Sequence, residues 1–232
     1  EQAAAHAAAA YARSTGRVGV CLATSGPGAT NLVTGIADAN SDSASIVAIT
    51  GNVPSHLLGR NAFQEVNIVD IVRPITKKAY LVTEVTEIPQ VVAECFHLAA
   101  NGRPGPVLID VPKDIQQHYP HDLRGRYVAP RIPAIVKSDG TTVSGLTLSQ
   151  VEEAGQLLRA SKRPVIYAGG GIISSDTAGQ LVNLAERLNC PVTTTLMGLG
   201  AMQPDHSLFL GPLGMHGSLA ANVGVNEADL VL

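Results

Sequence analysis

The stretch Thr24-Ser25-Gly26-Pro27-Gly28-Ala29-Thr30-Asn31 decides how the rest of this chain is interpreted. Before it, residues 18–23 form an apolar run with the length and β-branched content of a buried parallel strand. After it, residues 29–39 have helical spacing. A strand, a glycine-rich turn and a helix in this order let the backbone approach a ligand closely, and the helix start offers free N–H groups. The alternative is that Gly26 and Gly28 only permit a tight turn.

The stretch matches neither of two common phosphate-binding motifs. In the dinucleotide fingerprint a third glycine stands where this chain has Asn31, and no Gly-Lys-Ser/Thr of a Walker loop follows. From these residues alone, a cofactor site and a simple turn remain equally supported.

An alanine-rich helix is expected over residues 1–13, with Glu1 at its beginning. Alanine suits a helix that is packed closely on several sides, so a carboxylate there is expected to be poorly solvated. Burial raises the pKa of a carboxyl group and lets it share a proton with a nitrogen base. The alternative, which position alone favours, is an exposed first residue stabilised by the helix dipole.

Strands and helices alternate along the whole chain. This alternation predicts an α/β fold with two doubly wound parallel-sheet domains, each with its ligand at the carboxyl ends of the strands. Strands are expected at residues 45–51, ended by Gly51, at 107–112, stopped by proline, at 164–168 and at 190–196. Helices are expected at residues 87–100, 148–160 and 177–188, the second capped by Thr147 or Ser149 with Glu152 or Glu153 following.

Composition limits the possible functions. The chain has 232 residues, 45% of them hydrophobic, a formal charge of −3 and only 16 scattered Lys and Arg, which gives no footprint for nucleic acid. No apolar run long enough to span a membrane and no secretion leader are present. The cysteines Cys21, Cys95 and Cys190 are far apart in apolar contexts, which indicates buried, reduced thiols without metal spacing in a cytoplasmic type of protein.

Two glycine-bearing turns follow neighbouring strands of the second predicted domain. They are Gly169-Gly170-Gly171 and Met197-Gly198-Leu199-Gly200. One such turn is commonly a loop without a ligand. Two adjacent turns would present bare backbone to one crevice, which favours a nucleotide.

Several motifs occur in order and together resemble a known family. The first are Glu-Gln-Ala-Ala-Ala-His from Glu1 and the Gly26 stretch; the later ones are Ala62-Phe63-Gln64-Glu65, Gly102-Arg103-Pro104-Gly105-Pro106-Val107, Thr195-Leu196-Met197-Gly198-Leu199-Gly200 and Leu213-Gly214-Met215-His216-Gly217. The chain resembles the thiamine-diphosphate enzymes and, within them, the catalytic large subunit of acetohydroxyacid synthase, also called acetolactate synthase. The resemblance runs from Glu1 almost to Leu232.

The resemblance implies roles for residues of the first domain. Glu1 would hydrogen-bond the thiamine aminopyrimidine and promote proton removal from the cofactor, while Pro27 and Asn31 would hold that ring. Gln64 would lie near the reacting carbon beside Phe63, and Lys113 at the mouth of the substrate channel. The catalytic residues implied are therefore Glu1, Gln64 and Lys113. On spacing alone, Lys113 is an ordinary strand-end lysine.

The resemblance also implies a largely structural FAD. Its contact positions match Arg103, Gly169, Gly170, Thr195, Leu196, Met197, Gly214, Met215, His216 and Gly217. On spacing alone, Arg103 is an ordinary surface arginine and His216 is more typical of a helix start than of a ligand or acid.

The implied reaction decarboxylates pyruvate and joins its two-carbon unit to a second 2-keto acid, the first common step of branched-chain amino-acid synthesis. The cofactors would be thiamine diphosphate, FAD and magnesium. The Gly-Asp-Gly motif that holds magnesium and the diphosphate in this family does not occur in this sequence. The enzyme would be a homodimer or tetramer, with a regulatory small subunit possible, and cytoplasmic, plastid or mitochondrial.

The expected organisation is a pyrimidine-binding domain over residues 1–115, a linker over 116–146 and a central FAD-binding domain over 147–232. Both ends are expected to be cut, so this piece alone is expected to be inactive. Asn52 and Gly59-Arg60-Asn61 depart from the family pattern, which bears on substrate preference. The alternatives are a sister thiamine enzyme, such as a pyruvate oxidase, sulfoacetaldehyde acetyltransferase or oxalyl-CoA decarboxylase, and a non-catalytic nucleotide-binding module. A glyoxylate carboligase is disfavoured because Glu1 is present.

Overall fold

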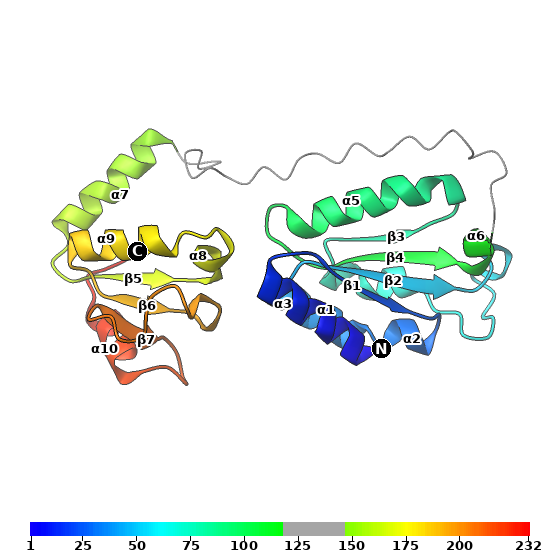
Figure 1. Ribbon diagram of the computed structural model, residues 1–232, viewed down its shortest axis with the longest axis horizontal. Helices are drawn as coiled ribbons and strands as arrows, with labels where there is room; N and C mark the ends of the chain where they lie inside the picture. Colours follow the sequence, from blue (N-terminus) through cyan, green and yellow to red (C-terminus); the bar gives the residue numbers. More distant parts are fainter. Residues whose placement is uncertain (118–146) are drawn as a thin grey trace. The chain divides into compact units, whose positions relative to one another are not determined.

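The computed structural model describes residues 1–117 and 147–232, which belong to two compact units (Figure 1). Unit 1 holds the described residues up to Gln117, and unit 2 those from Thr147. Each unit contains a four-stranded parallel sheet with helices around it, which confirms the predicted α/β fold with two parallel-sheet domains. The predicted linker lies outside the described residues except for Gln116 and Gln117, which are helical. The exact domain boundaries stay a prediction.

The sheet of unit 1 has the strand order β1-β2-β4-β3, and each neighbouring pair is parallel. Its strands are β1 (Gly19–Ala23), β2 (Ile46–Asn52), β3 (Lys78–Leu81) and β4 (Val107–Pro112). Its α-helices are α1 (Gln2–Thr15), α2 (Pro27–Thr30), α3 (Val33–Ser41), α4 (Ile68–Val72), α5 (Ile88–Ala100) and α6 (Lys113–Gln117). Short 3-10 turns are η1 (Ser55–Leu57), η2 (Arg73–Ile75) and η3 (Val85–Glu87).

Helices cover both faces of this sheet (Figure 1). Successive side chains of a strand point to opposite faces, so one strand contributes side chains to the core on each face. Ile46 and Ala48 of β2 belong to the core beneath α1 and α3. Val47, between them, belongs to the core beneath α5, together with Cys95 and Ala99. β2 is therefore buried on both faces, as a central parallel strand is. The buried strand predicted at residues 18–23 is instead the edge strand β1, and its Val20 and Leu22 are 43% and 67% exposed.

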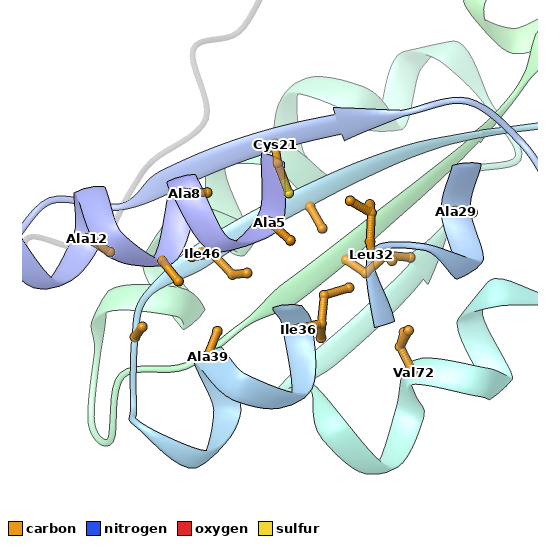
Figure 2. Close-up of a cluster of buried hydrophobic side chains, with 14 of the residues drawn as sticks. Ala5, Ala8, Ala12, Cys21, Ala29, Leu32, Ile36, Ala39, Ile46 and Val72 are labelled. Atoms are coloured by element: carbon orange, nitrogen blue, oxygen red, sulfur yellow. The ribbon is translucent and has the colours of Figure 1, made fainter. Parts of the chain in front are cut away.

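The helix α1 packs closely on its neighbours, as its alanine content predicted. Figure 2 shows Ala5, Ala8 and Ala12 of α1 around the same core as residues of α3. A methyl group added at Gly19 of β1 would lie 2.1 Å from the Ala8 carbonyl oxygen, and one at Gly35 of α3 only 2.5 Å from Ala5 Cβ. Small residues on both sides of these contacts therefore set the position of α1 on the sheet.

Some local predictions for unit 1 were wrong. The single helix expected at residues 29–39 is two helices, because the N–H of Leu32 bonds the Ala29 carbonyl, three residues back, and interrupts the helical pattern. Gly51 does not end its strand: β2 continues through Gly51, which pairs with Val111 of β4. Pairing with a central strand outweighs the weak strand propensity of glycine. The edge strand β3 was not predicted.

Unit 2 has the strand order β7-β6-β5-β8, again parallel throughout. Its strands are β5 (Pro164–Ala168), β6 (Val192–Thr194), β7 (Phe209–Pro212) and β8 (Leu230–Val231). Its helices are α7 (Leu148–Ala160), α8 (Gly170–Ser174), α9 (Ala178–Leu188) and α10 (Leu219–Glu227), with the 3-10 turn η5 (Leu196–Gly198).

The helix α7 spans the predicted residues, and its capping box is formed by Thr147 with Gln150, rather than with Glu152 or Glu153 as expected. The strand predicted at residues 190–196 is shorter, because η5 begins at Leu196. Cys21, Cys95 and Cys190 are free and buried, as predicted. A membrane-crossing helix is not found in the part of the chain that the structure describes.

Gly19→Ala is expected to destabilise the chain by about 1–3 kcal/mol, because the added methyl group would overlap the Ala8 carbonyl and force α1 away from β1. Urea denaturation followed by circular dichroism measures this change. The control is Gly179→Ala in α9, where no atom lies within 4 Å of the added group. That substitution should stabilise the helix by about 0.5–1 kcal/mol. Equal stability of the two variants would contradict the role of Gly19 in seating α1.

Candidate functional site

Glu1 and Asn31 meet beside the glycine turn of unit 1. Glu1 is the residue immediately before α1, and Asn31 is the residue immediately after α2. The Asn31 Nδ2 atom donates to Glu1 Oε2 at 3.2 Å. A Cβ added at Gly28 would lie 3.7 Å from the other carboxylate oxygen, Oε1. One oxygen is thus oriented by an amide, and the other faces bare backbone.

Of the two alternatives for Glu1, the structure shows the exposed residue that position alone favoured, and the poorly solvated carboxylate that the alanines suggested is wrong. Residues 1–4 are exposed, and the buried face of α1 begins only at Ala5. The close packing that the alanines predicted therefore starts one turn beyond Glu1. Within the described residues Glu1 is exposed, and its one side-chain hydrogen bond is to Asn31.

The turn also contacts Gln64, a residue far along the chain. Gly26 has φ 61°, and a Cβ added there would lie 2.7 Å from the Gln64 carbonyl oxygen and 2.9 Å from its Cα. Only a glycine tolerates this close approach. Gln64 itself has a left-handed backbone with φ 60°, and its neighbour Phe63 is 88% exposed. The structure thus brings Gln64 to the turn that carries Pro27, the first residue of α2.

A cavity of about 390 Å³ opens at the carboxyl ends of β1, β2 and β4, the edge at which a ligand was predicted. Lys113, at the start of α6, is among its lining residues and is exposed. The full lining is Leu22, Ala23, Thr24, Ser25, Ile49, Thr50, Gly51, Asn52, Val111, Lys113 and Gln116. Glu1, Asn31 and Gln64 do not line it.

A buried polar cluster below this edge was missed by the sequence reasoning. Asp110 of β4 is 1% exposed, and its carboxylate accepts hydrogen bonds of 2.6 Å from both Thr50 Oγ1 and Asn52 Nδ2. The same Asn52 amide donates to the Val66 carbonyl at 3.3 Å. Burial raises the pKa of the Asp110 carboxyl, and the two hydrogen bonds offset part of that rise. An acidic residue inside an otherwise apolar strand was the available signal.

Arg103 is not brought to this site. It precedes β4 and therefore lies at the amino ends of the strands, opposite the glycine turn. Its Nε donates to Ser43 Oγ at 2.8 Å, and Nη2 donates to the carbonyls of Asn40 and Ser41 at 3.1 and 3.3 Å. These are the last carbonyls of α3, where a cation is favourable. Within unit 1, Arg103 therefore stabilises the end of a helix.

In unit 2, the turns that follow three parallel strands lie side by side. A Cβ added at Gly170, after β5, would lie 3.0 Å from Met197 Cβ, after β6, and one at Gly169 would lie 3.9 Å from Thr195. The N–H of Leu213, after β7, donates to the Thr194 carbonyl at 2.9 Å. Gly170 and Gly171 begin α8 rather than forming an open loop. The predicted residues thus gather at one edge of this sheet.

This edge of unit 2 exposes large apolar side chains. Leu196 is 77% and Met215 92% exposed, and Met197 and His216 are also exposed. Gly214 has φ 122°, a conformation that favours glycine, and a Cβ added at Gly217 would lie 2.2 Å from the Pro212 carbonyl oxygen. The Thr194 hydroxyl is buried without a hydrogen-bond partner among the described residues. An apolar, glycine-lined edge of this kind suits a flat aromatic ligand.

Two family models match the chain. The thiamine pyrophosphate enzyme N-terminal TPP binding domain matches residues 1–71, and the thiamine pyrophosphate enzyme central domain matches residues 151–232.

Curated relatives align with all of the chain. The acetolactate synthase large subunit of Corynebacterium glutamicum is 50% identical over 232 residues, and the chain spans 36% of its length. Acetolactate synthase 2, chloroplastic, of Zea mays is 52% identical over 239 residues, with 35% of its length spanned. The probable acetolactate synthase large subunit of Methanocaldococcus jannaschii is 46% identical over 235 residues, with 39% spanned. The chain thus spans well under half the length of these relatives.

Asp110→Asn is expected to change how stability depends on pH. Because burial raises the Asp110 pKa above its unfolded value of about 3.9, this group stabilises the folded chain most at low pH. That contribution is lost as the pH rises through the folded pKa. The free energy of unfolding of the unsubstituted chain, minus that of Asp110→Asn, should therefore fall as the pH rises above about 4. Urea denaturation at several pH values measures this difference.

The control for this experiment is Asp114→Asn, which should show the opposite slope. The N–H of Ser55 donates to the Asp114 carboxylate at 2.9 Å and lowers its pKa. The Asp114 contribution is therefore present at neutral pH and is lost as the pH falls. The same sign of slope for both variants would contradict a desolvated environment for the Asp110 carboxyl.

Proposed function

The chain belongs to the thiamine pyrophosphate enzymes, and from this premise we propose that it is part of an acetolactate synthase large subunit. The proposed reaction decarboxylates pyruvate and joins the two-carbon unit to a second 2-keto acid, which gives acetolactate or acetohydroxybutyrate. Identities of 46–52% along the whole chain to proteins named acetolactate synthase support it. The observation that carries it is the Glu1–Asn31 pair beside the bare backbone of Gly28.

The residues at this turn fit the aminopyrimidine end of thiamine diphosphate. Gly28, which packs against the Thr24 methyl group, places no side chain beside Glu1 Oε1. A carboxylate can accept a hydrogen bond from a ring nitrogen or share a proton with it. When bound, thiamine diphosphate supplies the electron sink that a 2-keto acid needs to lose carbon dioxide. Glu1, Pro27, Asn31 and Gln64 are the residues proposed to hold it.

The proposed work of the protein is binding, orientation and proton transfer. Asn31 donates to Glu1 Oε2 and so leaves Oε1 to take up or release a proton. Gln64 contacts the turn through its backbone and has an exposed amide for the reacting centre. Phe63 offers an exposed ring as a wall of the site. The Lys113 ammonium lines the cavity at the strand ends, where its charge would attract the carboxylate of a keto acid.

Excluding water from this site requires a further part of the protein or a second subunit to cover it. The Glu1 carboxylate and the Phe63 ring are exposed in the part of the chain that the structure describes. A general acid or base gains from a desolvated site. We therefore propose that a second subunit covers this turn, so that the enzyme is at least a homodimer, with or without a regulatory small subunit.

For unit 2 the proposed ligand is FAD in a largely structural role. The three adjacent turns and the exposed apolar residues of its edge fit a flat, partly apolar cofactor. The proposed contacts are Gly169, Gly170, Thr195, Leu196, Met197, Gly214, Met215, His216 and Gly217. Arg103 belongs to this proposal by resemblance only, since its hydrogen bonds support a structural role in unit 1.

Magnesium and the diphosphate are proposed to bind elsewhere in the protein. A cluster of three or more His, Cys, Asp or Glu side chains able to hold a metal ion does not occur in residues 1–117 and 147–232. Gly-Asp-Gly is likewise missing from the sequence. The described residues therefore do not fit a metal site.

Glu1→Gln is expected to lower acetolactate formation from pyruvate by about a hundredfold to ten-thousandfold, because glutamine cannot exchange a proton at Oε1. The assay uses the full-length protein containing this chain, with thiamine diphosphate, magnesium and FAD. The control is Glu84→Gln, an exposed glutamate of unit 1 away from the turn, which should keep its activity. A folded, cofactor-loaded protein without acetolactate activity would instead favour a sister 2-keto acid enzyme.

Leu196→Ser is expected to weaken FAD binding about tenfold or more, since burying a leucine against a ligand contributes about 1.5–3 kcal/mol. Flavin absorbance of the purified full-length protein, titrated with FAD, measures the affinity. The matched control is Leu188→Ser at the end of α9, which is exposed but away from the three turns. Equal affinities would count against this edge as the flavin site, and retention of an adenine nucleotide without flavin would favour a nucleotide-binding module.

A further inference from the structure

The loop at residues 53–67, which joins β2 to α4, holds an unfavourable backbone conformation at its tip. Gly59, Asn61 and Gln64 have φ angles of 76°, 54° and 60°. Residues with a side chain rarely adopt these angles, and they persist only where the surrounding structure enforces them. Two such non-glycine residues within one short loop therefore call for a specific stabilising contact.

Glu65 supplies that contact. Its Oε1 accepts a hydrogen bond from the Gly59 N–H, and its Oε2 accepts one from the Ala62 N–H at 2.9 Å. The Glu65 N–H in turn donates to the Ala62 carbonyl at 2.9 Å. One carboxylate thus binds the backbone on both sides of Asn61, and hydrogen bonds to a charged acceptor are the stronger kind. The N–H groups of Ala62 and Gly59 hold the pKa of Glu65 below its ordinary value, so the carboxylate form is the one present at neutral pH.

The neighbour of Glu65 is the residue that reaches the glycine turn. The Gln64 backbone contacts Gly26 so closely that a methyl group there would overlap its carbonyl oxygen. The far end of the loop is fixed separately, because Asn52 joins the Val66 carbonyl to the buried Asp110 carboxylate. The start of the loop is fixed by Ser55, whose N–H and hydroxyl donate to the Asp114 carboxylate. At the tip, residues 59–62, the side-chain hydrogen bonds come from Glu65.

We propose that Glu65 is a positioning residue of the enzyme: its carboxylate holds the loop tip so that Gln64 stays against Gly26, beside the Glu1–Asn31 pair. This proposal rests on the proposed function, which is where Gln64 receives its role. Neither close substitute can do the same. Glutamine has one acceptor oxygen and would turn an N–H group toward a backbone donor, and aspartate is shorter by one methylene group.

The test of coupling is a double-mutant cycle in the full-length protein, using Glu65→Gln, Gln64→Ala and both together. Glu65→Gln alone should lower kcat for acetolactate formation about tenfold to a hundredfold, with the pyruvate KM within about twofold. In the Gln64→Ala background, the same Glu65→Gln substitution should change kcat by less than about twofold, since the group that it positions is gone. Equal losses in the two backgrounds would overturn the proposal.

A second readout does not depend on activity. Trypsin cleaves after Arg60, which lies between the two N–H groups that Glu65 binds. In the 232-residue chain, Glu65→Gln should speed cleavage of the bond after Arg60 about tenfold or more, measured by mass spectrometry, while Glu84→Gln leaves it unchanged. Unchanged cleavage in Glu65→Gln would overturn the proposal whatever the activity. Faster cleavage, together with a folded and cofactor-loaded full-length protein that forms no acetolactate, would uphold the loop contact and overturn the proposed function instead.

Discussion

The close approach of α1 to β1 and α3 is the constraint on which the candidate site depends. Gly19 and Gly35 allow the Ala8 carbonyl and the Ala5 side chain to approach to distances at which no other residue would fit. This contact sets the position of α1 on the sheet, and Glu1 is the residue immediately before α1. A helix displaced by one larger side chain would take the carboxylate away from Asn31. Stability and the proposed function therefore depend on the same residues, because Gly19 and Gly35 both allow α1 to pack and hold Glu1 beside Asn31.

Bare backbone at the carboxyl ends of parallel strands is the feature that the two units share. In unit 1, Gly26 and Gly28 bring the turn after β1 against Gln64 and Glu1. In unit 2, Gly169 and Gly170 bring the turn after β5 against that after β6. A parallel sheet gathers the loops of all its strands at one edge, and glycine lets the chain pass there without filling the space. Each unit thus has an edge at which a ligand can approach the backbone closely.

Polar side chains hold the loops around the unit 1 edge from within the protein. Asp110 is buried below the edge and is satisfied by Thr50 and Asn52, and the Asn52 amide extends this network to the loop that carries Gln64. Glu65 organises the tip of the same loop from the surface. A loop with left-handed residues needs such anchors, because its backbone cannot form the repeating bonds of a helix or strand. These hydrogen bonds therefore determine the position of Gln64, on which its proposed role depends.

The sequence by itself determined the parallel α/β class, most strands and helices, and the residues that form turns at the strand ends. These follow from local periodicity and from the conformational freedom of glycine, which need no knowledge of distant contacts. Only the tertiary structure decided that Arg103 stabilises the end of α3, and that Asp110 and Glu65 hold the loops of the site. It also decided that β2 continues through Gly51. In each of these cases the residue contacts a partner that lies elsewhere in the fold or depends on a loop conformation. Local periodicity encodes neither, so only folding brings the residue and its partner together.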